Sequence, residues 1–460
     1  DTTDTRHTLK EVEITAWQQR KILSGLLSGK IKLNVAELNT LPRFLGETDA
    51  LRTMKLMPGV LTTGELNSGF YVRGSESSHN QILLNGAPIY NAMHMLGFFS
   101  VFNSGHMNTF TLYKSHLDAS KGGRLSATLD MQTRDTLVSK PTVSGNIGII
   151  ASQATVALPL GKKVSVYLSG RKTYLGLLVQ PSEKDKVTAN FYYGSDYLDI
   201  ETGIYQTEGR IKWSNIAASI LWNRPLGRIG EMTHTFYITR YKNRLNISQN
   251  QFTAWLPSEI TDYGYKNIFS FREEKFLGTY GLEYVYHHMY PQIVETQGAY
   301  TIHTDPDSRL YRIHEGALFI NGKYFFSPRL SAEAGLRYSG TAQFGKFNYH
   351  TYRQGEIIDT QTYGKGELIK FYGGFEPRIA LYFLPGSNQR ISLSYNLTRQ
   401  YIGQVSSSSI GFPTDFWMPA SRNIPPQRAH SFSAGYSIAL DQDNYEFSSE
   451  LYYKRLHNQM

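Results

Sequence analysis

From Thr142 to its end, the sequence alternates apolar and polar residues with a period of two. The runs 164–169, 391–397 and 445–453 show the pattern most clearly, and in the last of them glutamates stand opposite aromatic residues. Side chains point to opposite faces of a strand in turn, so this period predicts antiparallel strands with one wet and one apolar face. The apolar face can point to a core, as in a soluble sandwich, or to lipid, as in a porin-like barrel.

The connections between these strands alternate between short and long. Tight turns are predicted near residues 161–162, 226–230, 273–274, 327–328, 386–388 and 442–443. Long polar connections are predicted at 174–206, 246–262, 290–307, 341–371 and 401–428. Strict alternation puts every long connection at one end of the strands, which is typical of outer-membrane barrels with short periplasmic turns and long extracellular loops. We therefore expect a transmembrane antiparallel β-barrel.

The number of predicted strands bears on closure of that barrel. We count about thirteen strands, whereas plugged transporters have about twenty-two. An open edge in lipid would leave backbone groups unpaired. We therefore expect only the first part of the barrel to be present, with further strands after Met460 or from another chain.

Composition narrows the class of protein. Aromatic residues make up 13% of the chain, with 32 Tyr and 24 Phe, and membrane barrels place such residues in interfacial girdles. No apolar run of 18 residues occurs, which excludes a transmembrane helix. The net charge of +9 suits an anionic partner such as lipopolysaccharide. The absence of Lys/Arg runs disfavours nucleic acid and favours charges scattered over loops and lumen. With no cysteine, the redox compartment cannot be read.

Residues 70–130 predict a small mixed domain ahead of the barrel. Ile82, Leu83 and Leu84 form a continuous apolar run, as in a strand buried on both faces. Asn85-Gly86 follows at once, and both residues tolerate positive φ, so a tight hairpin turn is expected there. The run 125–132 alternates again and predicts another half-buried strand.

This domain resembles the plug of TonB-dependent outer-membrane receptors. The resemblance rests on Arg73-Gly74 after a strand, Asn85-Gly86-Ala87-Pro88-Ile89, Tyr113-Lys114, and Gly122-Gly123-Arg124-Leu125-Ser126, in family order and spacing. The run 96–103 looks most like a branch of the family found in Bacteroidetes. The resemblance covers about the first third of the chain. It departs from the family at Asn85, where Asp is frequent, and at Lys121, where an aromatic residue is common.

The resemblance implies a function and a location. The protein would be a receptor and transporter of the Gram-negative outer membrane, with a plug in its lumen reachable from the periplasm. It would import a scarce small-molecule, peptide or glycan ligand by energy-coupled plug remodelling. A surface lipoprotein and lipopolysaccharide are further possible partners. The alternative is a plugged-barrel structural subunit of a larger complex without transport.

The N-terminal segment alternates charged and β-branched residues and can form an extended strand. It resembles the TonB box, the segment by which such receptors engage TonB, and β-augmentation onto a partner sheet is the physical mode. The residues expected to contact TonB are Glu11, Val12, Glu13, Ile14, Thr15 and Ala16. The alternative is an ordinary first strand of the plug. We assign 1–18 to this segment, 19–138 to an α+β plug with a helix over 48–57, and 139–460 to the barrel.

Several plug residues are candidates for holding the plug in the barrel. Arg73 is predicted on an apolar strand, where a buried charge needs a partner. As the family uses it, Arg73 would be a latch to inward-facing barrel carboxylates, with Lys114 and Arg124 as weaker candidates. A salt bridge internal to the plug is the alternative. The motif residues are Arg73, Gly74, Asn85, Gly86, Lys114 and Arg124.

Two plug loops, 75–80 and 89–103, are expected to meet the ligand from above. The contacts would come from Tyr90, Asn91, His94, Phe98 and Phe99, together with Phe102. The alternative for Phe98, Phe99 and Phe102 is the plug's own core.

No residue pattern favours an enzyme, a cofactor or a metal. The sequence contains no Walker motif, no Gly-x-Ser-x-Gly and no cysteine nucleophile. His287 and His288 are neighbours on a predicted strand, so they face opposite sides and cannot share a metal. The plug histidines, which are His79, His94, His106 and His116, lack the spacing of metal ligands.

Overall fold

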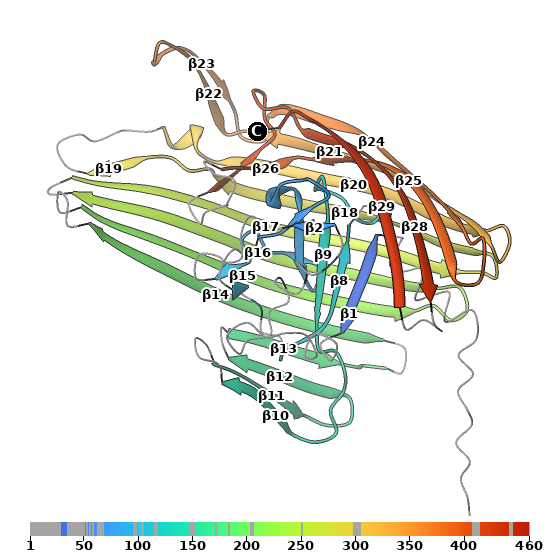
Figure 1. Cartoon of the computed structure of the whole chain (residues 1–460). Coiled ribbons are helices and arrows are strands. Elements are labelled where there is room, and N and C mark those ends of the chain that lie inside the picture. The colour runs from blue at the N-terminus through green and yellow to red at the C-terminus, as the bar shows by residue number, and fades with distance from the viewer. Residues whose placement is uncertain are drawn as a thin grey trace, which may run out of the picture.

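The computed structural model describes most of the chain as strand. The described residues are 29–34, 51, 54, 57, 59–61, 69–94, 99–100, 102, 105–114, 118–147, 152–170, 173–182, 185–202, 207–249, 252–297, 305–406, 415–440 and 445–459. They form a small N-terminal domain and one long curved sheet (Figure 1). Within these residues, no helix is long and apolar enough to cross a membrane.

The N-terminal domain is built on a five-stranded sheet in the order β1-β8-β9-β4-β5. Its strands are β1 (Lys30–Asn34), β4 (Gln81–Leu84), β5 (Ala87–Pro88), β8 (Met107–Tyr113) and β9 (Thr128–Thr133). Strand β4 runs parallel to β9, whereas the other pairs are antiparallel. The predicted apolar run therefore lies in the sheet next to the predicted alternating strand.

Short elements surround this sheet. They are β2 (Val60–Leu61) paired with β3 (Tyr71–Val72), β6 (Met93–His94) paired with β7 (Phe99–Ser100), and the 3-10 helix η1 (Ser77–His79). Of the helix predicted over 48–57, Leu51, Met54 and Met57 are described. Leu51 and Met54 are helical and fully buried in the domain core, and Met57 lies in a bend that packs against it. The proposed TonB-contacting residues lie outside the described residues.

The turn between β4 and β5 has the predicted conformation. Asn85 has φ 49° and Gly86 has φ 80°, which is the mirror-image turn that fits the twist of a two-residue hairpin. The Asn85 side chain accepts the amide of Thr133 at 3.0 Å and donates to its hydroxyl at 3.1 Å. A Cβ on Gly86 would lie 2.8 Å from Cγ2 of Thr235 in the long sheet. The turn therefore requires glycine for its conformation and for its close approach to the wall.

The long sheet has sixteen strands, and its main path is β10 to β18, then β20, β21, β24, β25, β28 and β29. The strands are β10 (Thr142–Ile147), β11 (Ser152–Pro159), β12 (Val164–Gly170), β13 (Thr173–Val179), β14 (Lys186–Thr202), β15 (Thr207–Pro225), β16 (Glu231–Gln249), β17 (Phe252–Arg272), β18 (Phe276–Tyr290), β19 (Glu295–Gln297), β20 (Tyr311–Phe325), β21 (Leu330–Phe344), β24 (Leu368–Phe383), β25 (Gln389–Gln400), β28 (Gln427–Leu440) and β29 (Tyr445–His457). All neighbours pair antiparallel.

Two of the predicted long connections are wrong. Residues 174–206 hold most of β13 and all of β14, and residues 246–262 belong largely to β16 and β17. This is why the sequence predicted about thirteen strands, whereas the described residues form a long sheet of sixteen. Strands of 19 and 21 residues are about twice the length that crosses a membrane. The halves of β16 and β17 on the side of the long connections have the polar composition of loops, so the sequence predicted a loop there.

The remaining long connections carry small elements of their own. The connection after β18 holds β19 and the 3-10 helix η3 (Pro306–Ser308). The connection after β21 forms the hairpin β22 (Phe347–Arg353) and β23 (Glu356–Tyr363), which projects from the sheet (Figure 1). The connection after β25 forms β26 (Ile402–Val405) and β27 (Phe416–Pro419). All three lie at the same end of the strands, opposite the short turns.

The two faces of the long sheet differ in the sense expected of a barrel in lipid. On β16, the outward Phe236 and Ile238 are each 49% exposed, whereas the alternating Thr235 and Thr239 are buried. On β20, the outward Leu318 and Ile320 are likewise exposed. Apolar side chains outside and polar side chains inside are the inverse of a soluble sandwich.

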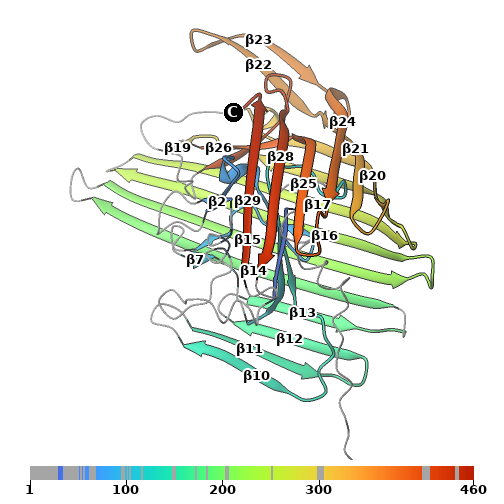
Figure 2. The same ribbon diagram turned by 45° about the vertical axis from the view of Figure 1, so that its right-hand side comes forward.

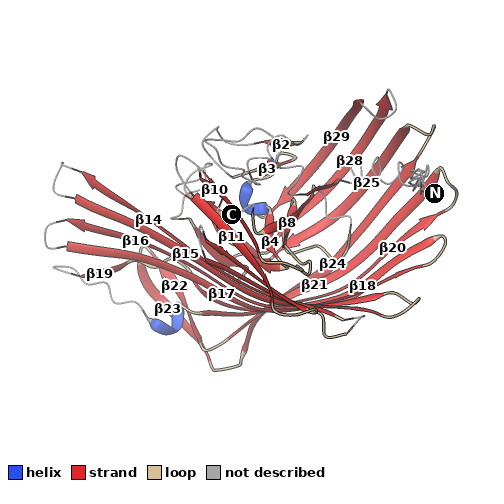
Figure 3. Cartoon of the chain, turned by 90° about the horizontal axis from the view of Figure 1, so that it is seen from below, coloured by secondary structure: helices blue, strands red, loops and turns tan. Residues whose placement is uncertain are grey.

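The N-terminal domain lies on the concave face of the long sheet. Figures 2 and 3 show the sheet curving around this domain. The apolar core of the domain includes wall residues, among them Tyr192, Ala217 and Tyr237. The end strands β10 and β29 do not pair with each other among the described residues.

We expect Gly86→Ala to loosen the N-terminal domain from the wall. The added methyl costs roughly 1–2 kcal/mol in the left-handed conformation and also meets Thr235. Gly59→Ala is the matched control, because Gly59 has φ 76° and open space around the missing Cβ. Limited proteolysis of the intact protein should cleave the Gly86 variant faster. Equal rates for the two variants would show that the contact with Thr235 is unimportant.

Candidate functional site

The clearest contact between the N-terminal domain and the wall joins two cations to one carboxylate. The Arg73 guanidinium forms an ion pair with Oε1 of Glu450 on β29, and Lys114 Nζ lies 3.4 Å from its Oε2. Arg73 and Lys114 are each 5% exposed. Burial lowers the pKa of both cations, and Glu450 opposes that shift. Two of the three proposed latch residues therefore reach one inward-facing carboxylate.

The backbone at Arg73 differs from the sequence prediction. Arg73 does not lie within a strand. It follows β3 in a tight turn, with φ 50° at Arg73 and 71° at Gly74, closed by a bridge between Val72 and Ser75. The Arg73-Gly74 pair thus adopts two successive positive φ values, as Asn85-Gly86 does. The turn places the guanidinium beyond the strand and next to the wall.

A second cation on β29 contacts the same part of the N-terminal domain. Lys454 Nζ donates to the hydroxyl of Ser75 at 2.5 Å and to that of Ser126 at 3.2 Å. Glu450 and Lys454 are four residues apart on one strand, so they share its inward face. Strand β29 therefore contacts both the Arg-Gly turn and the segment that follows Arg124.

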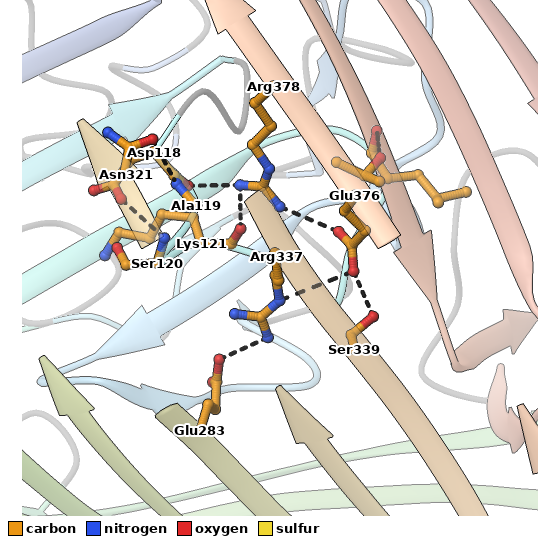
Figure 4. A network of polar contacts seen from close by, with 12 residues as sticks. Asp118, Ala119, Ser120, Lys121, Glu283, Asn321, Arg337, Ser339, Glu376 and Arg378 are labelled. Carbon is orange, nitrogen blue, oxygen red and sulfur yellow. Dashed lines mark hydrogen bonds and ion pairs between the residues drawn. The ribbon is translucent and has the colours of Figure 1, made fainter. Parts of the chain in front are cut away.

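The loop 118–124 is held by its backbone on other strands of the wall, β17, β20 and β24 (Figure 4). Arg378 donates to the carbonyl oxygens of Asp118 and Lys121, both at 2.6 Å. Lys266 donates to the carbonyl of Ser120, and the amide of Ala119 lies 3.4 Å from Oδ1 of Asn321. Contacts to main-chain atoms fix the position of the loop but do not depend on the identity of its side chains.

Gly122 in this loop lies directly against Arg337. A Cβ at Gly122 would stand 2.6 Å from its Nε. The Gly-Gly pair of the motif is therefore needed for close approach to the wall, in addition to the left-handed φ of Gly123.

Behind this loop the wall holds a buried cluster of paired charges. Arg337 lies 2.9 Å from Glu283, and Arg378 lies 3.1 Å from Glu376, which is fully buried. Ser339 donates to Glu376, and Lys266 pairs with Glu283 at 3.3 Å. Figure 4 shows that the residues come from neighbouring strands and point toward the loop. Removing one partner from such a cluster leaves an uncompensated charge.

The far side of the N-terminal domain meets the segment β26–β27. Arg124 donates to the carbonyl of Ile402 at 3.3 Å and lies 4.9 Å from the ring of Trp417. Trp417 meets Tyr90 edge to face at 5.1 Å. Arg124 thus contacts aromatic rings and a carbonyl, whereas the latch prediction had assigned it a carboxylate.

Tyr90 and Asn91 are engaged by the wall. The Tyr90 hydroxyl donates to Asp262 at 2.6 Å, and the carbonyl of Asn91 accepts from Asn215 at 2.7 Å. Asp262 also contacts His287 Nδ1 at 2.7 Å. His287 is buried on the inner face, so it faces away from the neighbouring His288, as the sequence predicted. A ligand contact by Tyr90 or Asn91 stays a prediction.

The other proposed ligand residues are placed in part. Phe102 is 1% exposed and belongs to the domain core, which is the alternative expected for it. The backbones of His94 and Phe99 pair in β6–β7, and their side chains, like the whole of Phe98, lie outside the described part. A cavity of about 70 Å³ between Tyr90, Arg124, Gln404 and Trp417 adjoins this region.

The sequence analysis missed the wall half of this interface. The missed residues are Asp262, Lys266, Glu283, Arg337, Glu376, Arg378, Glu450 and Lys454. A signal was present, because Glu376 and Arg378 are two apart on a strand whose other face is apolar. A charge on the wet face of one strand does not reveal its partner on another. Among the described residues, no group of acidic residues and histidines could hold a metal.

A comparison with known families gives this arrangement a name. The family model described as TonB dependent receptor-like, beta-barrel matches residues 144–460. The chain belongs to the TonB-dependent receptor family. The N-terminal domain is therefore the plug, the long sheet is barrel wall, and the family is one of outer-membrane receptors and transporters. The branch of the family expected from 96–103 stays a prediction.

Solved structures agree on the fold. The chain is similar to the ferric yersiniabactin uptake receptor FyuA from Yersinia pestis, with TM-score 0.66, 9% identity, and coverage of 93% of this chain and 72% of that one. For the FrpB iron transporter from Neisseria meningitidis (F3-3 variant), the TM-score is 0.65 and the identity 11%, with coverage of 93% of this chain and 73% of that one. For the hemophore receptor HasR from Serratia marcescens, the TM-score is 0.57 and the identity 12%, with coverage of 93% of this chain and 72% of that one. No curated protein matches the sequence.

We expect Glu450→Gln to free the plug partly, because it leaves Arg73 and Lys114 without a carboxylate. Breaking a buried pair costs roughly 3–5 kcal/mol, and the partial exposure of Glu450 reduces this to about 1–3 kcal/mol. The readout is the rate at which protease cleaves the plug in the intact receptor. Glu231→Gln, at an exposed position of the short-turn end, is the control. An unchanged rate would mean that the ion pairs do not hold the plug.

Plug retention should also weaken in mild acid. Burial, followed by the charges of Lys454 and Arg124, lowers the pKa of His79 to about 4, against about 6.5 in an unfolded chain. Stability from this group is complete above pH 6.5 and is lost as pH falls toward 4, by up to about 3 kcal/mol.

His79→Gln should therefore flatten the dependence of plug proteolysis on pH between 7 and 4.5. Some dependence will remain, because burial and Arg134 lower the pKa of His106 to about 4 as well. His350→Gln, on the projecting hairpin of Figure 1, should leave the profile unchanged. A His79 variant with the parental profile would contradict the assignment.

Proposed function

We propose that this protein imports a scarce extracellular ligand across the outer membrane, with TonB supplying the energy by remodelling the plug. The observation that carries this proposal is the chemistry of the plug's contact with the wall. The contact includes ion pairs and hydrogen bonds at two places, centred on Glu450 and on Arg378. Water can replace such bonds once they are separated, so a pulled plug can leave and return.

The plug sheet offers a path for the pull. Strand β1 pairs with β8 in the register Lys30 to Tyr113 and Asn34 to Thr109. The amide of Lys114 donates to the carbonyl of Gly29 at 2.5 Å. Force arriving from residues 11–16 would therefore reach β1 at the end that adjoins Lys114. Peeling would start at a residue that pairs with Glu450, which couples the N-terminal segment to the latch.

The ligand would arrive from the side of the long connections, which we assign to the outside. There the plug surface at Tyr90 and Arg124 faces Trp417 of β27. The cavity of about 70 Å³ at this point is far smaller than ligand pockets of about 300–1,000 Å³. Binding would thus displace β26–β27 or loop 89–103. The ligand class stays open among small molecules, peptides and glycans, and a surface lipoprotein is a further possible partner.

The similar structures are of receptors and transporters, which favours transport over an enzymatic role. They give no support to a purely structural subunit.

We expect Ile14→Pro to abolish uptake while leaving ligand binding at the cell surface intact. Proline removes an amide N–H from the strand that would add to the TonB sheet. Thr5→Pro, upstream of the alternating run, is the control and should transport normally. The measurement is uptake of the ligand compared with its retention on whole cells. Normal uptake by the Ile14 variant would refute TonB coupling through this segment.

A further inference from the structure

The outward face of the barrel wall changes from apolar and aromatic to mixed polar within one step of the strand register, and the first cation appears there. One outward row crosses β15 to β18, and its residues pair side by side: Ala218, Ile238, Tyr263 and Tyr286. Two residues further along each strand, the next outward row holds Ile216, Arg240, Thr261 and His288 in the same pairing. Aromatic residues in the first row are typical of a membrane interface. The second row is therefore where the lipid-facing band ends.

Strand length supports this placement. On β16 the band runs from Glu231 at the short turn to Arg240, about ten residues, and a tilted transmembrane strand needs about 9–11. The strand continues to Gln249. The part beyond Arg240 thus projects above the hydrocarbon on the side of the long connections.

Four cations gather on the outer face of this projecting part. Lys212 pairs in register with Arg244, and Lys242 pairs with Glu259. We call Lys212, Arg240, Lys242 and Arg244 the collar patch. Glu259 bonds Arg240 at 2.5 Å and Lys242 at 3.0 Å. Within the described residues, Lys212 and Arg244 have no carboxylate at ion-pair distance, so the patch keeps an excess of positive charge.

The wall is hollowed at the collar patch. A cavity of about 520 Å³ is lined by Lys212, Lys242 and Arg244, with Tyr290 and Arg309 on its other side. Arg309 is neutralised by Glu295 at 3.0 Å. Along each strand, Lys242 and Arg244 alternate with the inward-facing Asn243, so the patch faces away from the lumen and the transport path.

We propose that the collar patch binds the phosphate groups of a phosphorylated lipid in the outer leaflet. Its phosphates would lie against Lys212, Lys242 and Arg244, while its acyl chains cover Phe236, Ile238 and Tyr263 below. A basic cluster at a membrane surface attracts anionic headgroups, and charge-assisted bonds to phosphate are strong. The proposal rests on the proposed outer-membrane placement, with the long connections outside. It is independent of which ligand is transported.

The test is binding of lipopolysaccharide to the intact purified receptor, measured with a fluorescent derivative in detergent. Removing a charge should weaken binding about fivefold, so Lys212→Gln with Arg244→Gln should weaken it about 25-fold. The charge-retaining pair Lys212→Arg and Arg244→Lys should bind almost as the parent does. The matched control is Arg228→Gln with Lys275→Gln, two exposed cations at the short-turn end. Heat-modifiable gel mobility verifies that each variant is folded.

Two further probes identify the source of the phosphate. Dephosphorylated lipopolysaccharide should bind the parent about as weakly as the double Gln variant binds the intact lipid, and inorganic phosphate at millimolar concentration should not displace the lipid. Equal binding by the Gln pair and the control pair would overturn the proposal. Strong binding of the dephosphorylated lipid, or full displacement by phosphate, would overturn it as well. Ligand uptake by the same variants tests the transport function separately, and loss of lipid binding with normal uptake supports the lipid site alone.

Discussion

The fold depends on the alternation of side chains along the wall strands. Each strand presents apolar residues outward and polar residues inward, so the lumen is lined with groups that must be hydrogen-bonded or paired. On β16, Phe236 and Ile238 face outward, while Thr235 and Thr239 face the plug. A plug inside such a lumen is therefore held by polar contacts in addition to the apolar core that it shares with Tyr192, Ala217 and Tyr237 of the wall. A wholly apolar inner face would lack the hydrogen bonds and ion pairs that water can replace when the two parts separate.

The two main contacts between plug and wall use different chemistry. At Glu450, side chains of both partners pair, so the contact depends on charge. At Arg378 and its neighbours, the wall bonds main-chain carbonyl and amide groups of the loop 118–124, so this contact depends on loop shape, which Gly122 and Gly123 supply. The first contact lies next to β1, because the amide of Lys114 bonds the carbonyl of Gly29. The second lies against a rigid cluster of buried ion pairs. Under the proposed coupling, the contact at Glu450 would separate first while the contact at Arg378 kept its register.

Local chemistry made much of this fold predictable from the sequence. Asn85-Gly86 predicted its turn because few residue pairs accept two left-handed conformations, and period-two alternation predicted the wall strands. The same logic failed at 246–262, because strands that continue beyond the membrane lose their apolar face and resemble loops. It also failed at 174–206, although β13 and the first half of β14 lie level with the lipid-facing band. It also failed for the wall half of the interface. The partner of Arg73 is Glu450, 377 residues away, and no local pattern encodes a pairing across the lumen.

The unequal length of the wall strands gives the mouth of the barrel a slope. Strands β15 to β17 have 19 to 21 residues, whereas β25, β28 and β29 have 12 to 14. At about 3.3 Å per residue, the long strands exceed the short ones by roughly 15–30 Å along their tilted axes, so one side of the described wall stands taller than the other. A diffusing molecule would be blocked by the long strands β15 to β17 and would enter over the short strands β25, β28 and β29. The β26–β27 segment arises from that low side, so the shortest route to the plug is also the one that the chain itself obstructs.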